Sequence, residues 1–260
     1  LLLQTVFQNP RAGPSVFGVN SGASLAVSIL MLTAGGSLSA FSSTLGGQMA
    51  VVVAAVIGAS AVMFIIIGIS AIVRSNVMLL IIGMMIGYLA SSAISILSYF
   101  ASEDGLQAYT IWGLGTFSNT TNDQMPVFLA ASLLPAAVAL FCIKPLNAFL
   151  LGDNYATNLG YNVKAIRNII LIVSSLLSAV VTAFCGPISF LGLAVPHLAR
   201  LTLKTDNHAV LLPSTMLIGG NVALLCFLIT IFPGSSSVLP INAITPLIGA
   251  PIILKIILKK

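Results

Sequence analysis

The chain has 260 residues, of which 58% are hydrophobic and only 6% are charged, and its mean hydropathy is +1.12. Soluble domains carry about 25% charged residues, so this composition excludes a soluble globular protein and indicates a helical protein that crosses a membrane several times. Its three cysteines stand apart in apolar runs without a CxxC motif, which favours small core residues over a redox or metal site.

Apolar runs that suit membrane helices recur along the whole chain, since a span needs roughly 20 apolar residues. The runs are 16–34, 47–73, 77–100, 126–143, 166–185, 188–203, 209–232 and 241–258, with a fragment at 1–8. We therefore expect an all-α, polytopic transmembrane bundle of eight spans plus a partial one, forming a single domain over residues 1–260. The chain begins within apolar sequence and lacks signal-peptide features, so we expect the natural protein to extend further at its N-terminus.

The basic residues orient this bundle. If the C-terminus is cytoplasmic and the spans alternate, all ten basic residues fall on the cytoplasmic side. They are Arg11, Arg74, Lys144, Lys164, Arg167, Arg200, Lys204, Lys255, Lys259 and Lys260. Because Lys and Arg concentrate in cytoplasmic loops, the net charge of +5 reports membrane orientation and does not indicate a nucleic-acid partner.

Small residues recur every four positions in the run 77–100. Gly83, Gly87, Ser91 and Ser95 therefore share a helical stripe. Such a stripe either lets helices pack closely in lipid or lines a weakly polar pathway for a bulky cargo.

The loop 101–125 contains the single tryptophan of the chain, Trp112. Trp112, Tyr109 and Phe117 predict either an aromatic belt at the membrane interface or a short helix beside an outer vestibule.

The loop 144–165 has the signals of two short helices outside the bilayer. Pro145 can open the first and Gly152 can end it; Asp153 can cap the second and Gly160 can end that one. The loop is either an ordinary interfacial connector or a docking surface for a cytoplasmic partner.

The stretch GPISFLGLAVPHLAR at 186–200 predicts a short, broken membrane helix. Pro196 removes a backbone donor and leaves the carbonyl of Gly192 without its helical partner. His197 is either a ligand or a packing residue at a helix end.

Motifs for chemistry are missing from the sequence. It contains no GxxxxGK[ST] loop, no His/Cys/Asp/Glu cluster with metal spacing and no acid in the middle of a span. We therefore expect no catalytic residue, metal site or cofactor in this chain, and we expect any energy source to be supplied by a partner.

Five sequence blocks, in order, resemble those of the FecCD-type permease subunits of ABC importers. They are QNPRAGPSVFGVNSGA (8–23), WGLGTFS (112–118), PLNAFLLGDNYATNLG (145–160), GPISFLGLAVPHLAR (186–200) and TPLIGAPIIL (245–254). Departures from the family pattern are Arg11 and Gly13 in the first block and Pro246 in the last.

The resemblance implies a ten-helix subunit in the bacterial cytoplasmic (inner) membrane that works as a homodimer. It also implies two cytoplasmic ATP-binding subunits, which would bind ATP and Mg²⁺, and a periplasmic or lipoprotein substrate-binding protein. The cargo would be an iron–siderophore, haem or cobalamin, moved by alternating access.

The resemblance also implies roles for individual residues. The ATPase-coupling loop would use Leu150, Leu151, Gly152, Asp153, Ala156, Leu159 and Gly160. The translocation path would use Gly83, Gly87, Ser91 and Ser95, and the cytoplasmic gate would use Ser75 and Asn76. Gly192, Pro196, His197 and Arg200 would form a structural family signature.

Three alternatives stay open from the sequence. One is an ABC permease for a molybdate-type oxyanion, and another is a non-transporting membrane scaffold. The third is a secondary transporter with a midplane site built from broken helices.

Overall fold

The computed structural model describes residues 1–10, 12–33, 45–73, 76–118, 120–231 and 239–258, with the backbone alone described at 45, 71, 76 and 252–258. Within these ranges the chain is all-helical, as predicted, and divides into two compact units. Unit 1 comprises 1–13, 137–170 and 188–260, and unit 2 comprises 14–136 and 171–187. The helices α7 (Met125–Phe141) and α10 (Val163–Cys185) contribute residues to both units.

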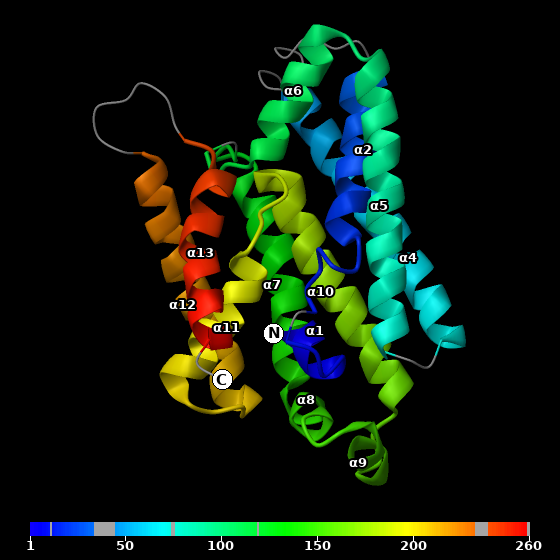
Figure 1. Cartoon of the computed structure of the whole chain (residues 1–260), viewed down its shortest axis with the longest axis vertical. Helices are drawn as coiled ribbons and strands as arrows, with labels where there is room; N and C mark the ends of the chain where they lie inside the picture. Colours follow the sequence, from blue (N-terminus) through cyan, green and yellow to red (C-terminus); the bar gives the residue numbers. More distant parts are fainter. Residues whose placement is uncertain (11, 34–44, 74–75, 119, 232–238, 259–260) are drawn as a thin grey trace. The chain divides into compact units, whose positions relative to one another are not determined.

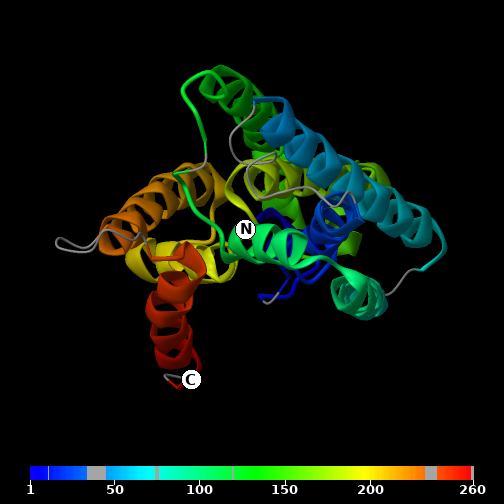
Figure 2. The same ribbon diagram turned by 90° about the horizontal axis from the view of Figure 1, so that it is seen from above.

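Unit 2 is organised around α2 (Val19–Thr33). This helix contacts α4 (Leu45–Ile72), α5 (Asn76–Phe100) and α6 (Glu103–Leu114), as Figures 1 and 2 show. Its buried side carries small and branched side chains, among them Ala23 and Val27, both at 0% exposure. Because helices in lipid gain no hydrophobic energy by associating, small side chains that permit close contact are what hold such a unit together.

Two glycines make the contact between α2 and α4. A Cβ atom built on Gly58 would collide with the carbonyl oxygen of Gly22, and one built on Gly22 would lie 2.6 Å from the carbonyl oxygen of Gly58. The two backbones therefore touch, and neither position has room for a side chain.

Unit 1 is organised around α11 (Leu191–Leu203), which packs against α12 (His208–Thr230) and α13 (Ile241–Leu258). Figure 2 shows the meeting of α11 and α13 clearly. Three short helices complete the unit: α1 (Leu2–Val6), α8 (Ile143–Phe149) and α9 (Asp153–Asn158). Of these, α8 contacts α1, α9 and α12.

Four of the described helical segments are long and apolar enough to cross a membrane. They are Gly46–Ser70, Val77–Phe100, Val163–Cys185 and His208–Thr230. A fifth appears if α7 and α8, whose axes differ by 56°, count as one bent span, whereas Val19–Thr33 and Leu191–Leu203 are shorter. The structure therefore confirms a polytopic helical protein, but it does not confirm the expected count of eight spans and a partial one.

The structure corrects one sequence expectation and decides between the two alternatives for the loop 101–125. Pro196 does not break α11, which is one continuous helix; the irregular backbone lies before it, at residues 186–190, where Phe190 adopts φ +67°. Of the two alternatives for the loop 101–125, the structure has the short helix, α6; Trp112 is only 8% exposed within unit 2 and does not belong to an exposed aromatic belt. Ser102 caps α6, accepting a hydrogen bond from the backbone of Gly105, and acids occupy its first turn, which explains where this helix begins.

The glycine contact gives a stability prediction. Gly58→Ala should destabilise the protein by about 1–3 kcal/mol, because the added methyl group forces the backbones of α2 and α4 apart. The midpoint of thermal unfolding in detergent, measured on the full-length protein, should fall by several degrees.

Gly68→Ala is the matched control, because a Cβ at Gly68 meets nothing within 4 Å. It should be neutral or stabilising by up to about 1 kcal/mol, since alanine is the better helix former. Equal midpoints for the two variants would contradict the glycine contact.

Candidate functional site

The loop between α7 and α10 folds as two short helices, as the sequence predicted. Gly152 (φ +103°) separates α8 from α9, and Gly160 (φ +86°) follows α9. Beyond α9, the N–H of Tyr161 donates to the carbonyl of Ala156 and the N–H of Gly160 donates to that of Thr157. This pair of bonds is a Schellman motif, which requires the left-handed conformation that glycine adopts at little cost.

The inner side of the loop is a small apolar core. Phe149 and Ala156 are fully buried, Ala148 is buried beside them, and Tyr161, Val163 and Ile166 pack against the cluster. Near α1, the amide of Gln8 donates to the carbonyl of Phe149 at 3.1 Å and so satisfies a group at the end of α8.

An ion pair fixes α9 to the start of α10. Arg167 Nη2 donates to Asp153 Oδ2 at 2.8 Å, and the guanidinium lies 5.9 Å from the centre of the Phe7 ring. The side chain of Arg167 is 9% exposed, whereas that of Asp153 is 41% exposed. The expected capping role of Asp153 is wrong: Gly152 occupies the cap position of α9, and the carboxylate serves Arg167 instead.

The outer side of the loop is apolar and exposed. It carries Leu150, Leu151, Tyr155 and Leu159, and we call these four residues the loop patch. Gly160 is also exposed, whereas Ala156 of the predicted coupling set is buried inward. The structure therefore presents apolar side chains on a firmly held frame, an arrangement typical of a docking surface.

The signature residues of α11 lie in unit 1 with different exposures. Gly192 is exposed, Pro196 is buried, and His197 is partly buried. Arg200 donates from Nη1 to Gln4 Oε1 at 3.0 Å, and its Nε lies 3.3 Å from Asp206 Oδ1. The contact with Gln4 gives Arg200 a structural partner in α1.

The small-residue stripe of α5 changes environment along its length. Gly83 is buried, and a Cβ there would lie 2.7 Å from Cα of Phe17. Gly87 is half-buried, whereas Ser91 and Ser95 are exposed. Each four-residue step turns by about 40° around a helix of 3.6 residues per turn, so the stripe leaves the packed face. The structure brings Gly83 and Gly87 into packing contacts and leaves the two serines on the open side of unit 2.

Two predicted gate residues cannot be placed. Ser75 and the side chain of Asn76 lie outside the described residues. The backbone of Asn76 begins α5.

Sequence reasoning missed a buried polar cluster at the start of α12. His208 is the first residue of α12 and is fully buried. Its ring lies between Thr5 and Asn147. Asn207, which caps α12 by accepting from the backbone of Ala209, is the sequence signal that could have placed the helix start.

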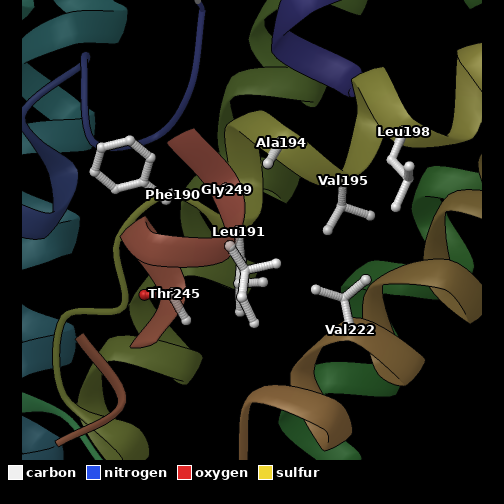
Figure 3. Close-up of a pocket in the computed structure, with 9 residues that line it drawn as sticks. Phe190, Leu191, Ala194, Val195, Leu198, Val222, Thr245 and Gly249 are labelled. Carbon is white, nitrogen blue, oxygen red and sulfur yellow. The ribbon is translucent and has the colours of Figure 1, made fainter. Parts of the chain in front are cut away.

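Unit 1 contains a small cavity between α11, α12 and α13, shown in Figure 3. Leu191, Val195 and Val222 point into it, and its volume of about 10 Å³ is roughly the space of one water molecule. It is a gap between packed helices and is too small for a cargo. Among the residues that the structure describes, no three His, Cys, Asp or Glu side chains come together as a metal site.

Comparison with known proteins gives a consistent result. The chain matches the FecCD transport family over residues 1–259. It is 30% identical over 259 residues to the vitamin B12 import system permease protein BtuC of Salmonella arizonae, a match that covers 99% of this chain and 75% of that protein. The protein of the same name from Salmonella typhi is also 30% identical, with 99% of this chain and 76% of that protein covered.

A solved structure resembles the fold. It is described as the inward-facing conformation of an ABC transporter assigned to the metal-chelate type. The similarity has a TM-score of 0.87 at 28% sequence identity and covers 100% of this chain and 80% of that one. Because the family match runs through nearly all residues of a helical membrane fold, the chain belongs to the FecCD transport family and is a membrane permease subunit rather than an enzyme.

Proposed function

We infer that this chain is the transmembrane permease subunit of an ATP-driven importer for a metal chelate: an iron–siderophore, haem or cobalamin. The observation that carries this inference is the α8–α9 loop. Its inner side is anchored by a buried core and an ion pair, and its outer side presents the loop patch. A permease without its own ATPase motif needs such a surface to receive the movement of an ATP-hydrolysing partner.

The assembly that this function requires has several parts. A second copy of the chain would complete the path, and two cytoplasmic subunits would bind ATP and Mg²⁺ and dock on the loop patch. A periplasmic or lipoprotein binding protein would deliver the cargo. The basic residues favour a cytoplasmic C-terminus, and they therefore also favour a position of the α8–α9 loop on the cytoplasmic side of the bacterial inner membrane.

The path is proposed to run along α5. Ser91 and Ser95 are exposed and offer weakly polar groups that a bulky chelate can pass without tight binding. Gly83 and Gly87 support that face by letting α5 pack closely on the segment before α2. Ser75 and Asn76 are proposed as the cytoplasmic gate.

The function is tested by the stimulation of ATP hydrolysis in the reconstituted importer. Cobalamin, haem, ferric siderophores and molybdate are added with the binding protein, and phosphate release is measured. We expect one of the chelates to stimulate hydrolysis and to accumulate inside proteoliposomes. Stimulation by molybdate alone would contradict a chelate importer.

A charge in the loop patch should weaken docking of the ATPase subunit. Leu159→Glu should lower the affinity by about tenfold or more, roughly 1.4 kcal/mol, because the carboxylate would lose water at an apolar interface. Affinity is measured by titrating the ATPase subunit onto the full-length permease in nanodiscs.

Leu106→Glu provides the matched control for this substitution. Leu106 is an exposed leucine on α6, outside the α8–α9 loop, so the same change there should leave ATPase binding unaltered. Unchanged binding by Leu159→Glu would remove the loop patch as the docking surface.

The ion pair beneath the patch gives a separate prediction. Asp153→Asn should destabilise the protein by about 1–2 kcal/mol, between the values typical of exposed and fully buried pairs, because Arg167 would keep a buried charge without its carboxylate. The thermal unfolding midpoint in detergent should fall accordingly.

Asp104→Asn controls for the general effect of losing a carboxylate from the first turn of a helix. Asp104 lies in the first turn of α6 and is exposed, and Asp153 lies in the first turn of α9. The difference between the two variants therefore isolates the pairing with Arg167. A shift of equal size in both would show that the ion pair contributes nothing to stability.

A further inference from the structure

A chain of hydrogen bonds around the buried side chain of His208 joins α8 to α12. His208 at the start of α12 is 0% exposed. Its backbone N–H donates to Asn147 Oδ1 at 2.8 Å, and its ring Nδ1 lies 3.0 Å from the same oxygen. On the other side of the ring, Nε2 lies 2.7 Å from Thr5 Oγ1.

The geometry determines the direction of each hydrogen bond. A backbone N–H can only donate, so the atom of Asn147 that faces it must be the amide oxygen. The ring Nδ1 therefore donates to that oxygen, and a neutral imidazole accepts at Nε2 from the hydroxyl of Thr5. The amide nitrogen of Asn147 donates in turn to Asn207 Oδ1 at 3.0 Å.

Asn147 is thus bound to α12 through three separate contacts. Two go to the backbone and ring of His208, and the third goes to Asn207, which also caps α12. A slide of α8 against α12 would leave the buried ring nitrogen and the buried backbone N–H without acceptors, which is costly away from water. The start of α12 must therefore follow α8 when α8 is displaced.

We call the hydrogen bonds of His208 with Asn147 and Thr5, together with that of Asn147 with Asn207, the joint. Charged groups lie beside the joint without forming part of it. Arg200 of α11 is occupied by Gln4 and by Asp206, which lies two residues before His208. The joint itself consists of uncharged donors and acceptors from α1, α8 and the start of α12.

We propose that Asn147 and His208 are positioning residues that transmit displacement of the coupling helix α8 into the membrane helix α12. The inference rests on the proposed function, because the displacement originates in an ATPase docked on the loop patch. The essential contact is the bond from Nδ1 of His208 to Asn147; the contact of Nε2 with Thr5 only orients the ring.

The test uses the full-length permease assembled with its ATPase subunit in nanodiscs. Hydrogen exchange is measured by mass spectrometry with and without ATP and vanadate, for peptides covering α8 and the first two turns of α12. In the wild type, the nucleotide should change exchange in both peptides. This readout needs no knowledge of the cargo.

Paired substitutions separate the two ring nitrogens. His208→Gln places its amide near the Nε2 position and loses the donor to Asn147, whereas His208→Asn keeps a donor near the Nδ1 position. His208→Gln and Asn147→Leu should reduce the nucleotide-dependent change in α12 by roughly fivefold or more, the lower range of typical coupling between sites. His208→Asn and Thr5→Val should retain it, and α8 should respond in all variants.

A merely structural role would alter exchange equally with and without nucleotide and would leave the difference intact. An α12 response in His208→Gln and Asn147→Leu that equals the wild type would overturn the inference, as would a wild-type α12 that does not respond while α8 does. If α8 itself shows no response, or the complex does not form, the proposed function fails and the inference fails with it.

Discussion

The α8–α9 loop depends on the ion pair between Arg167 and Asp153. Isolated helices shorter than about 12–15 residues are marginal in water, and α9 has only 6 residues. Tertiary contacts must therefore hold it: the carboxylate on Arg167, the buried Ala156, and the closing turn at Gly160. Arg167 in turn depends on Asp153, because a buried guanidinium requires an anion beside it. The loop patch keeps its arrangement because these contacts hold the loop from its inner side.

The long apolar helices α4 and α5 and the two short loop helices could be predicted because their signals are local. Apolar runs mark α4 and α5 directly, and Gly152 and Gly160 mark the turns where positive φ angles are needed. The role of Asp153 could not be predicted in the same way. A carboxylate at a helix start fits a cap equally well, and its actual partner, 14 residues away, is brought close only by the fold.

Tertiary packing accounts for the other differences between the sequence-based expectations and the observed structure. Pro196 predicted a break because it costs one backbone hydrogen bond, yet α11 stays helical through it. The irregular backbone lies instead at 186–190, where Gly186 adopts φ +77° and a Cβ would meet the carbonyl oxygen of Trp112 at 2.5 Å. The partners of His208 lie 203 and 61 residues away, so no local pattern could have identified this cluster.

Unit 1 contains two kinds of helix contact, apolar contacts that allow sliding and hydrogen bonds that prevent it. Between α11 and α12, Val195 lies against Gly219, and apolar surfaces of this kind can slide because dispersion contacts have little directionality. The contacts of Asn147 cannot slide, because each buried donor has one acceptor at a fixed place. In lipid, helix association relies on both packing and hydrogen bonds. A joint that is fixed at α8 and free to slide elsewhere is what the proposed alternating access requires, since a movement must enter at one point and still let the helices rearrange.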